Sequence, residues 1–390
     1  MSLNSDLQTL KTNIEGVKST LYTNLTNKGV TNISESDTLS TLANKVSTIT
    51  AGGSGVDFTQ IGYSNEFSSE LNSKMNADIA YSKTLLDAWN PSNTSAYRLY
   101  KSNKKLVYAP NIDTSNVNNM NSMFNGCSRL TSVPAFNTIK VTDMYSMFNG
   151  CTSLTSVPAF NTSKVTDMTG MFSGCSNITS VPELDTIKAT TMNSMFNGCA
   201  SITSVPAFNT INVNNMNNMF NGCTSLTSVP AFNTSNVTSM NSIFYNCTSL
   251  TSVPAFNTSK VTDMNNMFNR CTSLTTIEGI SFQSYSASTM SSSYLVGYGT
   301  NNSIRKAVFK DIGYQSNAKQ FNTENIANWG VNTSEIADAR QSLIDSLITY
   351  SFDRATAGYP TCTIKLSSNT KALLTEDEKT QITAKGFTIA

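Results

Sequence analysis

The chain repeats one stretch seven times, and the second copy reads Met144-Tyr-Ser-Met147-Phe148-Asn-Gly150-Cys151-Thr-Ser-Leu154-Thr-Ser-Val157-Pro158-Ala-Phe160. Cysteines mark the period, because they recur every 24 residues, at Cys127, Cys151, Cys175, Cys199, Cys223, Cys247 and Cys271. A fixed period of this length is typical of stacked supersecondary units, not of one globular core. The sequence therefore predicts a solenoid, in which each coil buries its apolar residues against the neighbouring coils.

The first half of each unit has the spacing of a helix. Met120, Met123, Phe124 and Cys127 follow one another at intervals of three and four residues, which places them on one helical face. The residue before the first methionine always belongs to the short set that caps helices: Asn119, Asp143, Asp167, Thr191, Asn215, Ser239 and Asp263. A glycine such as Gly126 tolerates the left-handed conformation that ends a helix. We therefore expect a two-turn helix in each unit and a ladder of buried, inert thiols.

The second half of each unit predicts a short parallel strand. It reads Leu130-Thr-Ser-Val133-Pro134-Ala-Phe136 in the first copy, and Glu278 replaces the proline in the last copy. Because proline has no amide to donate, the strand must end near it. The expected fold class is α/β: a leucine-rich-repeat-like solenoid of seven 24-residue units over residues 96–282, each with a short parallel strand and a short helix.

The repeat resembles a known family. Its last copy reads Asn257-Thr-Ser-Lys-Val-Thr-Asp-Met264-Asn-Asn-Met267-Phe-Asn-Arg-Cys271-Thr-Ser-Leu274. This unit is similar to the leucine-rich repeat of BspA-like surface proteins, although methionine and phenylalanine stand where leucine is usual. The resemblance implies a solenoid fold and adhesion or binding to a host surface.

The first 55 residues read as a separate module. Residues 1–50 contain a coiled-coil seam at Leu7, Leu10, Ile14, Val17 and Leu21, and residues 51–55 form a glycine-rich linker. The module resembles the N-terminal attachment segments of phage tail fibres. We therefore expect residues 1–50 to attach the protein and to make it a homo-oligomer.

Two further segments flank the repeat. Residues 56–95, which include Trp89, are expected to cover the N-terminal end of the solenoid. Residues 283–390 read as a mixed α/β cap and binding domain, with strands at 307–309 and 362–366 and a helix that begins at Ser334. Thr375 and Glu378 have the spacing of a capping box, which predicts the start of a further helix.

Composition excludes several kinds of function. The chain has no histidine, which rules out Ser-His-Asp and Cys-His nucleophiles and histidine-containing zinc sites. Its net charge of +1, with 13% charged residues, offers no overall attraction to nucleic acid or to an anionic membrane. No apolar run approaches the ~18 residues of a membrane span, and the start lacks a secretory signal. We expect no enzyme activity, cofactor, metal site, nucleic-acid partner or membrane insertion.

Binding is expected where the repeat is least regular. The polar ladder at Thr131-Ser132 hardly changes between units, so it is either structural or meets a repetitive ligand such as a glycan. Tyr145, Tyr245 and Tyr359 give more individual surfaces and are the candidate binding residues. A polysaccharide-cleaving enzyme would need two facing carboxylates, and no pair stands out.

The preferred hypothesis is a non-enzymatic phage virion protein. It would be a tail fibre or receptor-binding protein, assembled in the host cytoplasm with other virion proteins, and it would attach to a glycan or protein of the host cell surface. The alternative is a BspA-like adhesin on a bacterial cell surface. In both hypotheses the solenoid displays the binding surface.

Overall fold

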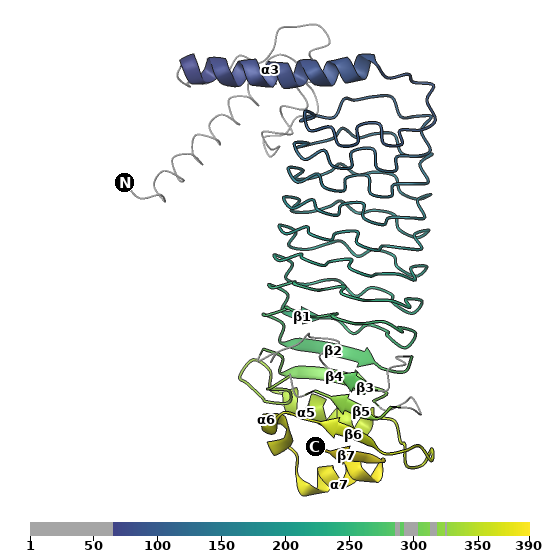
Figure 1. The fold of residues 1–390 in the computed structure, drawn as a ribbon, viewed down its shortest axis with the longest axis vertical. Helices are drawn as coiled ribbons and strands as arrows, with labels where there is room; N and C mark the ends of the chain where they lie inside the picture. The colour runs from purple at the N-terminus through teal and green to yellow at the C-terminus, as the bar shows by residue number, and fades with distance from the viewer. Residues whose placement is uncertain (1–64, 285–288, 292–302, 313–317, 324–325) are drawn as a thin grey trace.

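The protein is a rod of stacked coils. A computed structural model describes residues 65–284, 289–291, 303–312, 318–323 and 326–390. Helix α3 (Asn65–Asp87) lies across one end of the stack, and short strands and helices form the other end (Figure 1). The predicted helical module at 1–50 and the glycine linker at 51–55 lie outside the described residues.

Each coil contains a run of tight turns where the sequence predicted a helix, so that prediction is wrong. Met123 N donates to Met120 O within the coil at 3.2 Å, but Phe124 N donates to Met147 O of the next coil at 2.9 Å. Along the run, backbone amides that donate to a carbonyl of the same coil alternate with amides that donate to a carbonyl of the next coil. A two-turn helix would leave most of its terminal amides and carbonyls without partners, whereas the turns hydrogen-bond across the stack. The apolar stripe nevertheless faces inward as predicted.

Two residues in each run adopt left-handed backbone conformations. In the first cysteine-containing coil they are Ser122, with φ of 56°, and Gly126, with φ of 77°. The second position explains the glycine column, because glycine reaches positive φ without a steric cost. The first position is filled mostly by serine and asparagine, and each run is a chain of overlapping turns, in which every second amide donates to the carbonyl three residues before it.

Six of the seven predicted cap residues accept a backbone amide, but at turns, whereas Ser239 donates its hydroxyl to Asn217 Oδ1. Asp143 Oδ1 accepts a hydrogen bond from Tyr145 N at 2.9 Å, and Asn119 Oδ1 accepts one from Asn121 N at 2.9 Å. Such contacts two residues ahead are Asx turns, which fold the chain into the first turn of the run. These side chains accept backbone amides, as the sequence predicted for cap residues, although no helix follows them.

The interior of the rod is a set of stacked ladders. Phe124 and Phe148 lie parallel, with ring centroids 5.6 Å apart and an interplanar angle of 2°, and the same stacking continues through later coils. Methionines, cysteines, valines and leucines form parallel ladders that are buried throughout residues 117–274. Each coil thus buries its apolar side chains against the coils above and below it.

A buried threonine ladder also joins the coils, and the sequence analysis missed it. Thr162 is fully buried, and its Oγ1 donates to Asp185 O of the next coil at 2.8 Å. Asn161 N in turn donates to Thr138 Oγ1 of the preceding coil at 2.8 Å. The threonine hydroxyl can therefore satisfy both the amide and the carbonyl of one residue in the following coil, as Thr258 does for Ser281, which is why a polar side chain is kept inside.

Regular strands occur only toward the C-terminal end of the described stack. Earlier coils are joined by isolated parallel bridges, whereas β1 (Ser252–Val253) pairs with β2 (Thr276–Ser281). β1 ends directly before Pro254, and β2 continues through Glu278, the residue that replaces proline. The prediction of a short strand in every coil is therefore wrong for the earlier coils, where only isolated bridges form. Where strands do form, β1 stops before its proline as predicted. β4 (Lys306–Lys310) then pairs in parallel with β2.

The C-terminal end is a second parallel sheet covered by short helices. Its strand order is β3 (Thr289–Ser291), β5 (Gln320–Asn322), β6 (Cys362–Lys365) and β7 (Phe387–Ile389). The helices are α5 (Ala339–Ile344), which continues as a π-helical turn at Asp345–Thr349, α6 (Ser368–Ala372) and α7 (Glu376–Ala384).

Two predictions for this end have opposite outcomes. The capping box of Thr375 and Glu378 is present at the start of α7, as predicted. The helix predicted from Ser334 instead begins at Ala339, because Thr333 Oγ1 accepts the Ile336 amide at 3.1 Å and holds this stretch in a turn.

At the opposite end, α3 contacts the first coils through side chains. Trp89, which follows the helix, donates from Nε1 to Asp113 O at 2.8 Å and packs with Leu85 against the core. Asn103 Nδ2 donates to the Tyr81 hydroxyl at 2.9 Å. These contacts join the described part of the predicted N-terminal cap, within 56–95, to the stack.

Candidate functional site

The candidate binding site is a shallow depression on the turn face of the rod. It has a volume of about 400 Å³ and crosses three successive coils. Its lining consists of polar side chains around one aromatic ring: Asn121, Thr142, Asp143, Tyr145, Thr166 and Asp167. Tyr145, a predicted binding residue, is 41% exposed at this site.

Hydrogen bonds within the turns fix the acidic side chains of this site. Asp143 Oδ1 accepts from the Tyr145 amide, and Asp143 Oδ2 lies 3.2 Å from Asn121 Nδ2 and 3.3 Å from Asn119 Nδ2. Asp167 Oδ1 accepts from Thr169 N at 2.8 Å. Among the described residues, no group donates to Asp167 Oδ2. The site therefore offers a free carboxylate oxygen next to an exposed phenol ring.

This combination suits a polyhydroxylated ligand. An exposed tyrosine provides a flat apolar face with a polar tip, and the surrounding hydroxyl, amide and carboxylate groups can exchange hydrogen bonds with ligand hydroxyls. Asp143 and Asp167 belong to neighbouring coils that are joined by a parallel bridge at these residues. Asp143 and Asp167 each accept a backbone amide of their own turn. This structural role is sufficient to explain why an acidic residue stands at each position.

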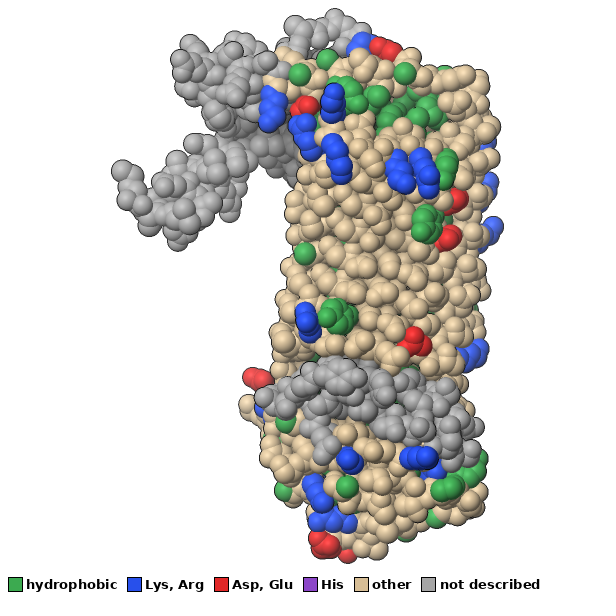
Figure 2. All heavy atoms as spheres, in the orientation of Figure 1, with side chains coloured by type: hydrophobic (Ala, Val, Ile, Leu, Met, Phe, Trp, Pro, Cys, Tyr) green, Lys and Arg blue, Asp and Glu red, His purple; other side chains and the backbone are tan. Residues whose placement is uncertain are grey.

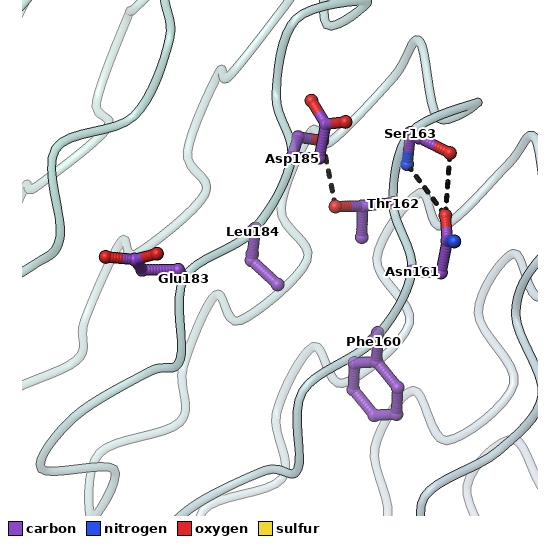
Figure 3. Close-up of a pocket in the computed structure, with 7 residues that line it drawn as sticks. All are labelled: Phe160, Asn161, Thr162, Ser163, Glu183, Leu184 and Asp185. Atoms are coloured by element: carbon purple, nitrogen blue, oxygen red, sulfur yellow. Dashed lines mark hydrogen bonds between the residues drawn. The ribbon is translucent and has the colours of Figure 1, made fainter.

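A second depression lies where one coil departs from the repeat (Figure 3). It has a volume of about 390 Å³ and is lined by Phe160, Asn161, Thr162, Ser163, Glu183, Leu184 and Asp185. Leu184 occupies the column that Phe160 fills in the preceding coil, and Glu183 occupies the column of Ala159. Asn161 Oδ1 accepts hydrogen bonds from both the amide and the hydroxyl of Ser163, at 3.2 and 2.7 Å.

The sequence analysis missed this second site, although its signal was visible. Ala-Phe-Asn becomes Glu183-Leu184-Asp185 in this copy alone among the first six. The change replaces a large ring by a smaller side chain and adds two exposed carboxylates. Among the described residues, no group of three His, Cys, Asp or Glu side chains comes together as a metal site.

The structure does not bring the three candidate tyrosines together. Tyr245 lies several coils away from Tyr145 and in another column, half-buried, with the Arg270 guanidinium 5.6 Å from its ring centroid. Tyr359 is 36% exposed at the C-terminal end, 5.6 Å from the Phe352 ring. Only Tyr145 lines one of the two depressions.

The repeat region matches a known protein family. The family model described as "Mycoplasma protein of unknown function, DUF285" matches residues 92–204 and again residues 190–307, which together make up more than half of the chain. The chain belongs to this family. The matched region contains the coils and both depressions, so the candidate sites lie on the DUF285 repeat itself.

Two solved structures are similar to this DUF285 protein. One is the leucine-rich repeat protein TpLRR of T. pallidum, 19% identical over 40% of this chain and 69% of that chain, with a TM-score of 0.32. The other is a leucine-rich repeat protein of Bacteroides ovatus, 17% identical over 57% of this chain and 67% of that chain, with a TM-score of 0.18. No curated protein matches the chain.

The cysteine ladder of the DUF285 repeat is buried and unpaired. All seven thiols of the ladder are fully buried, and Cys362 is buried in the C-terminal sheet. Cys151 Sγ donates to Phe124 O of the preceding coil at 3.1 Å. Burial raises the pKa of Cys127 and of Cys362 to about 11 and that of Cys199 well above its ordinary value. Such thiols stay protonated near neutral pH, which suits packing and not nucleophilic chemistry.

Within the described part of the chain, no helix combines the length and the apolar character that crossing a bilayer requires.

Proposed function

We propose that this DUF285 protein is a non-enzymatic binding protein whose solenoid displays a site for a surface glycan. The observation that carries the proposal is the Tyr145 depression, where an exposed ring lies beside a free carboxylate oxygen on an otherwise repetitive polar face. The rigid stack behind it supports the proposal, because a preorganised surface loses little entropy when it binds. The sequence resemblance to BspA-like surface proteins adds support for adhesion.

The experiment is binding of the full chain to a panel of immobilised glycans. Tyr145→Ala should weaken the tightest interaction about 30-fold, since removing a central aromatic contact costs about 2 kcal/mol. Tyr350→Ala is the matched control, because that ring is also 41% exposed but lies at the C-terminal end. Equal losses in the two variants, or capture of protein ligands with no glycan bound, would reject the proposed site. Incubation with the bound glycan should release no shorter product.

The cellular setting is part of the same proposal. The family description names Mycoplasma proteins. Together with the sequence resemblance to BspA-like surface proteins, this favours an adhesin on a bacterial cell surface. The phage-fibre setting depends on residues 1–50, whose sequence resembles tail-fibre attachment segments. Neighbouring genes distinguish the two settings: portal and tail genes beside this one would favour the virion.

We also propose that residues 1–50 hold the oligomer together. Their coiled-coil seam is the supporting feature, since apolar positions at alternating intervals of three and four residues pair helices. Light scattering should show that the full chain is an oligomer and that residues 51–390 alone are monomeric. The same number of subunits in both proteins would contradict this assignment.

A further inference from the structure

The first described coil carries a cluster of positive charge that later coils lack. Arg98, Lys101, Lys104 and Lys105 are all exposed on this coil, and Arg129 follows Lys105 in the same column of the next coil. We call these five residues the basic corner. Beyond Arg129, the corresponding positions of later coils hold only neutral residues, mainly serine, threonine and asparagine. In these columns, the positive charge therefore occurs only at the α3 end of the rod.

Among the described residues, little neutralises this charge. Arg129 lies 3.5 Å from Asp78 of α3, the only ion pair of the basic corner among the described residues. Lys104 Nζ donates to the neutral Gly126 carbonyl at 2.8 Å, and the Arg98 guanidinium lies 4.9 Å from the centroid of the Tyr97 ring. Like charges that gather without acidic partners repel one another, and an external anion would relieve that repulsion.

Exposed apolar side chains lie at the same end. Tyr97 is 49% exposed and Leu99 is 39% exposed, and both alternate in sequence with the cations. Leu86, near the end of α3, is also 39% exposed. Figure 2 shows hydrophobic side chains beside Lys and Arg side chains near α3, whereas the middle of the same face is mostly uncharged. The corner thus combines positive charge with apolar surface.

We propose that the basic corner binds the surface of a bilayer that contains anionic lipids. Lysine and arginine are attracted to anionic headgroups, and tyrosine and leucine are stabilised at the level of the headgroups. A soluble polyanion would leave Tyr97 and Leu99 in water.

This contact would orient the rod. The α3 end would lie against the membrane, and the C-terminal sheet with β7 would point away from it (Figure 1). The binding is peripheral, since it uses side chains of a folded coil and no spanning segment. It is independent of the glycan site, because Tyr145 does not belong to the basic corner.

The test is co-sedimentation of the full chain with vesicles of phosphatidylcholine alone or mixed with phosphatidylglycerol. The protein should bind only the mixed vesicles, and salt should weaken the binding. The triple variant K101Q/K104Q/K105Q should bind about 100-fold more weakly, since each lysine near an anionic surface contributes about fivefold. The control K140Q/K164Q/K188Q removes the same charge from exposed positions in later coils and should bind like the original protein.

A second pair of variants separates a lipid surface from a soluble polyanion. Y97S/L99S should weaken vesicle binding and leave any binding of inorganic polyphosphate unchanged. Equal binding to neutral vesicles, equal losses in the two lysine triples, or polyphosphate binding without vesicle binding would each overturn the proposal. Because Tyr145→Ala should not change vesicle binding, failure of the glycan site and failure of the basic corner can be told apart.

Discussion

Phe196→Ala should lower the free energy of unfolding of the solenoid by about 3–5 kcal/mol, the usual cost of emptying a buried aromatic site. Phe196 is fully buried in the middle of the ladder. Its ring centroid lies 5.6 Å from that of Phe172 and 5.7 Å from that of Phe220, in nearly parallel stacks. Neither neighbouring coil can collapse into the space, because each is held by its own turns and by hydrogen bonds to the next coil.

Urea unfolding followed by circular dichroism measures this effect. A repeat array need not unfold in two states, so the midpoint and slope of the first transition should be compared between variants. Ile187→Ala is the matched control, because that side chain is 47% exposed and its loss should change stability by less than about 0.5 kcal/mol. Similar losses in the two variants would mean that the phenylalanine ladder does not stabilise the rod.

Removing one whole coil should leave the protein folded, whereas removing half a coil should unfold it. Deletion of residues 191–214 joins Thr190 to Asn215, and every ladder stays in phase because hydrogen bonds link residues 24 apart, as between Thr190 Oγ1 and Thr166 O. Deletion of residues 191–202 removes the turn run of that coil and leaves its extended half. The chain could then no longer close the coil, and the core of both neighbours would be exposed.

Gel filtration and circular dichroism test both deletions. The whole-coil deletion should give a compact protein with the spectrum of the original chain and a modestly lower midpoint of unfolding, as expected for nearest-neighbour stacking. The half-coil deletion should aggregate or lose its folded spectrum. If both proteins fold equally well, or if the whole-coil deletion is as damaging as the other, the coils do not stack as interchangeable units.

The period and the inward-facing columns could be predicted from the sequence, but the local backbone could not. Met120, Met123, Phe124 and Cys127 face inward in a helix and also in a run of overlapping turns that close at every second residue. The helix and the run of turns differ in where the backbone amides donate their hydrogen bonds. In the turns, Phe124 N donates to Met147 O of the next coil. That bond depends on a neighbour stacked at hydrogen-bonding distance, which spacing within one unit cannot reveal.

A sequence signal for the turns did exist. Ser122, Ser146, Asn218 and their equivalents occupy one left-handed position. Glycine occupies the other, four residues later, in five coils, and Asn246 and Arg270 occupy it in the last two. Serine and asparagine in the middle of an apolar helix are unfavourable, because their side chains compete for backbone groups. Two such columns four residues apart therefore favour consecutive turns.

The candidate site was predictable in part. Tyr145 was identified because it breaks the regularity of its column, and the structure places it in a depression. Glu183 and Leu184 break their columns as well but were not singled out. The basic corner was hidden by the net charge of +1, because averaging over 390 residues cancels four cations within eight positions of one coil.

The coils share one continuous core, and the reactivity of the buried thiols is the sharpest test of that arrangement. At about pH 8, native protein should show none of its eight cysteines reacting with a thiol reagent, and denatured protein should show all eight. The physical reasons are exclusion of the reagent and thiol pKa values that burial raises to about 11 for Cys127 and Cys362 and to about 12 for Cys271. Labelling of the repeat cysteines in native protein as fast as in denatured protein would contradict the account.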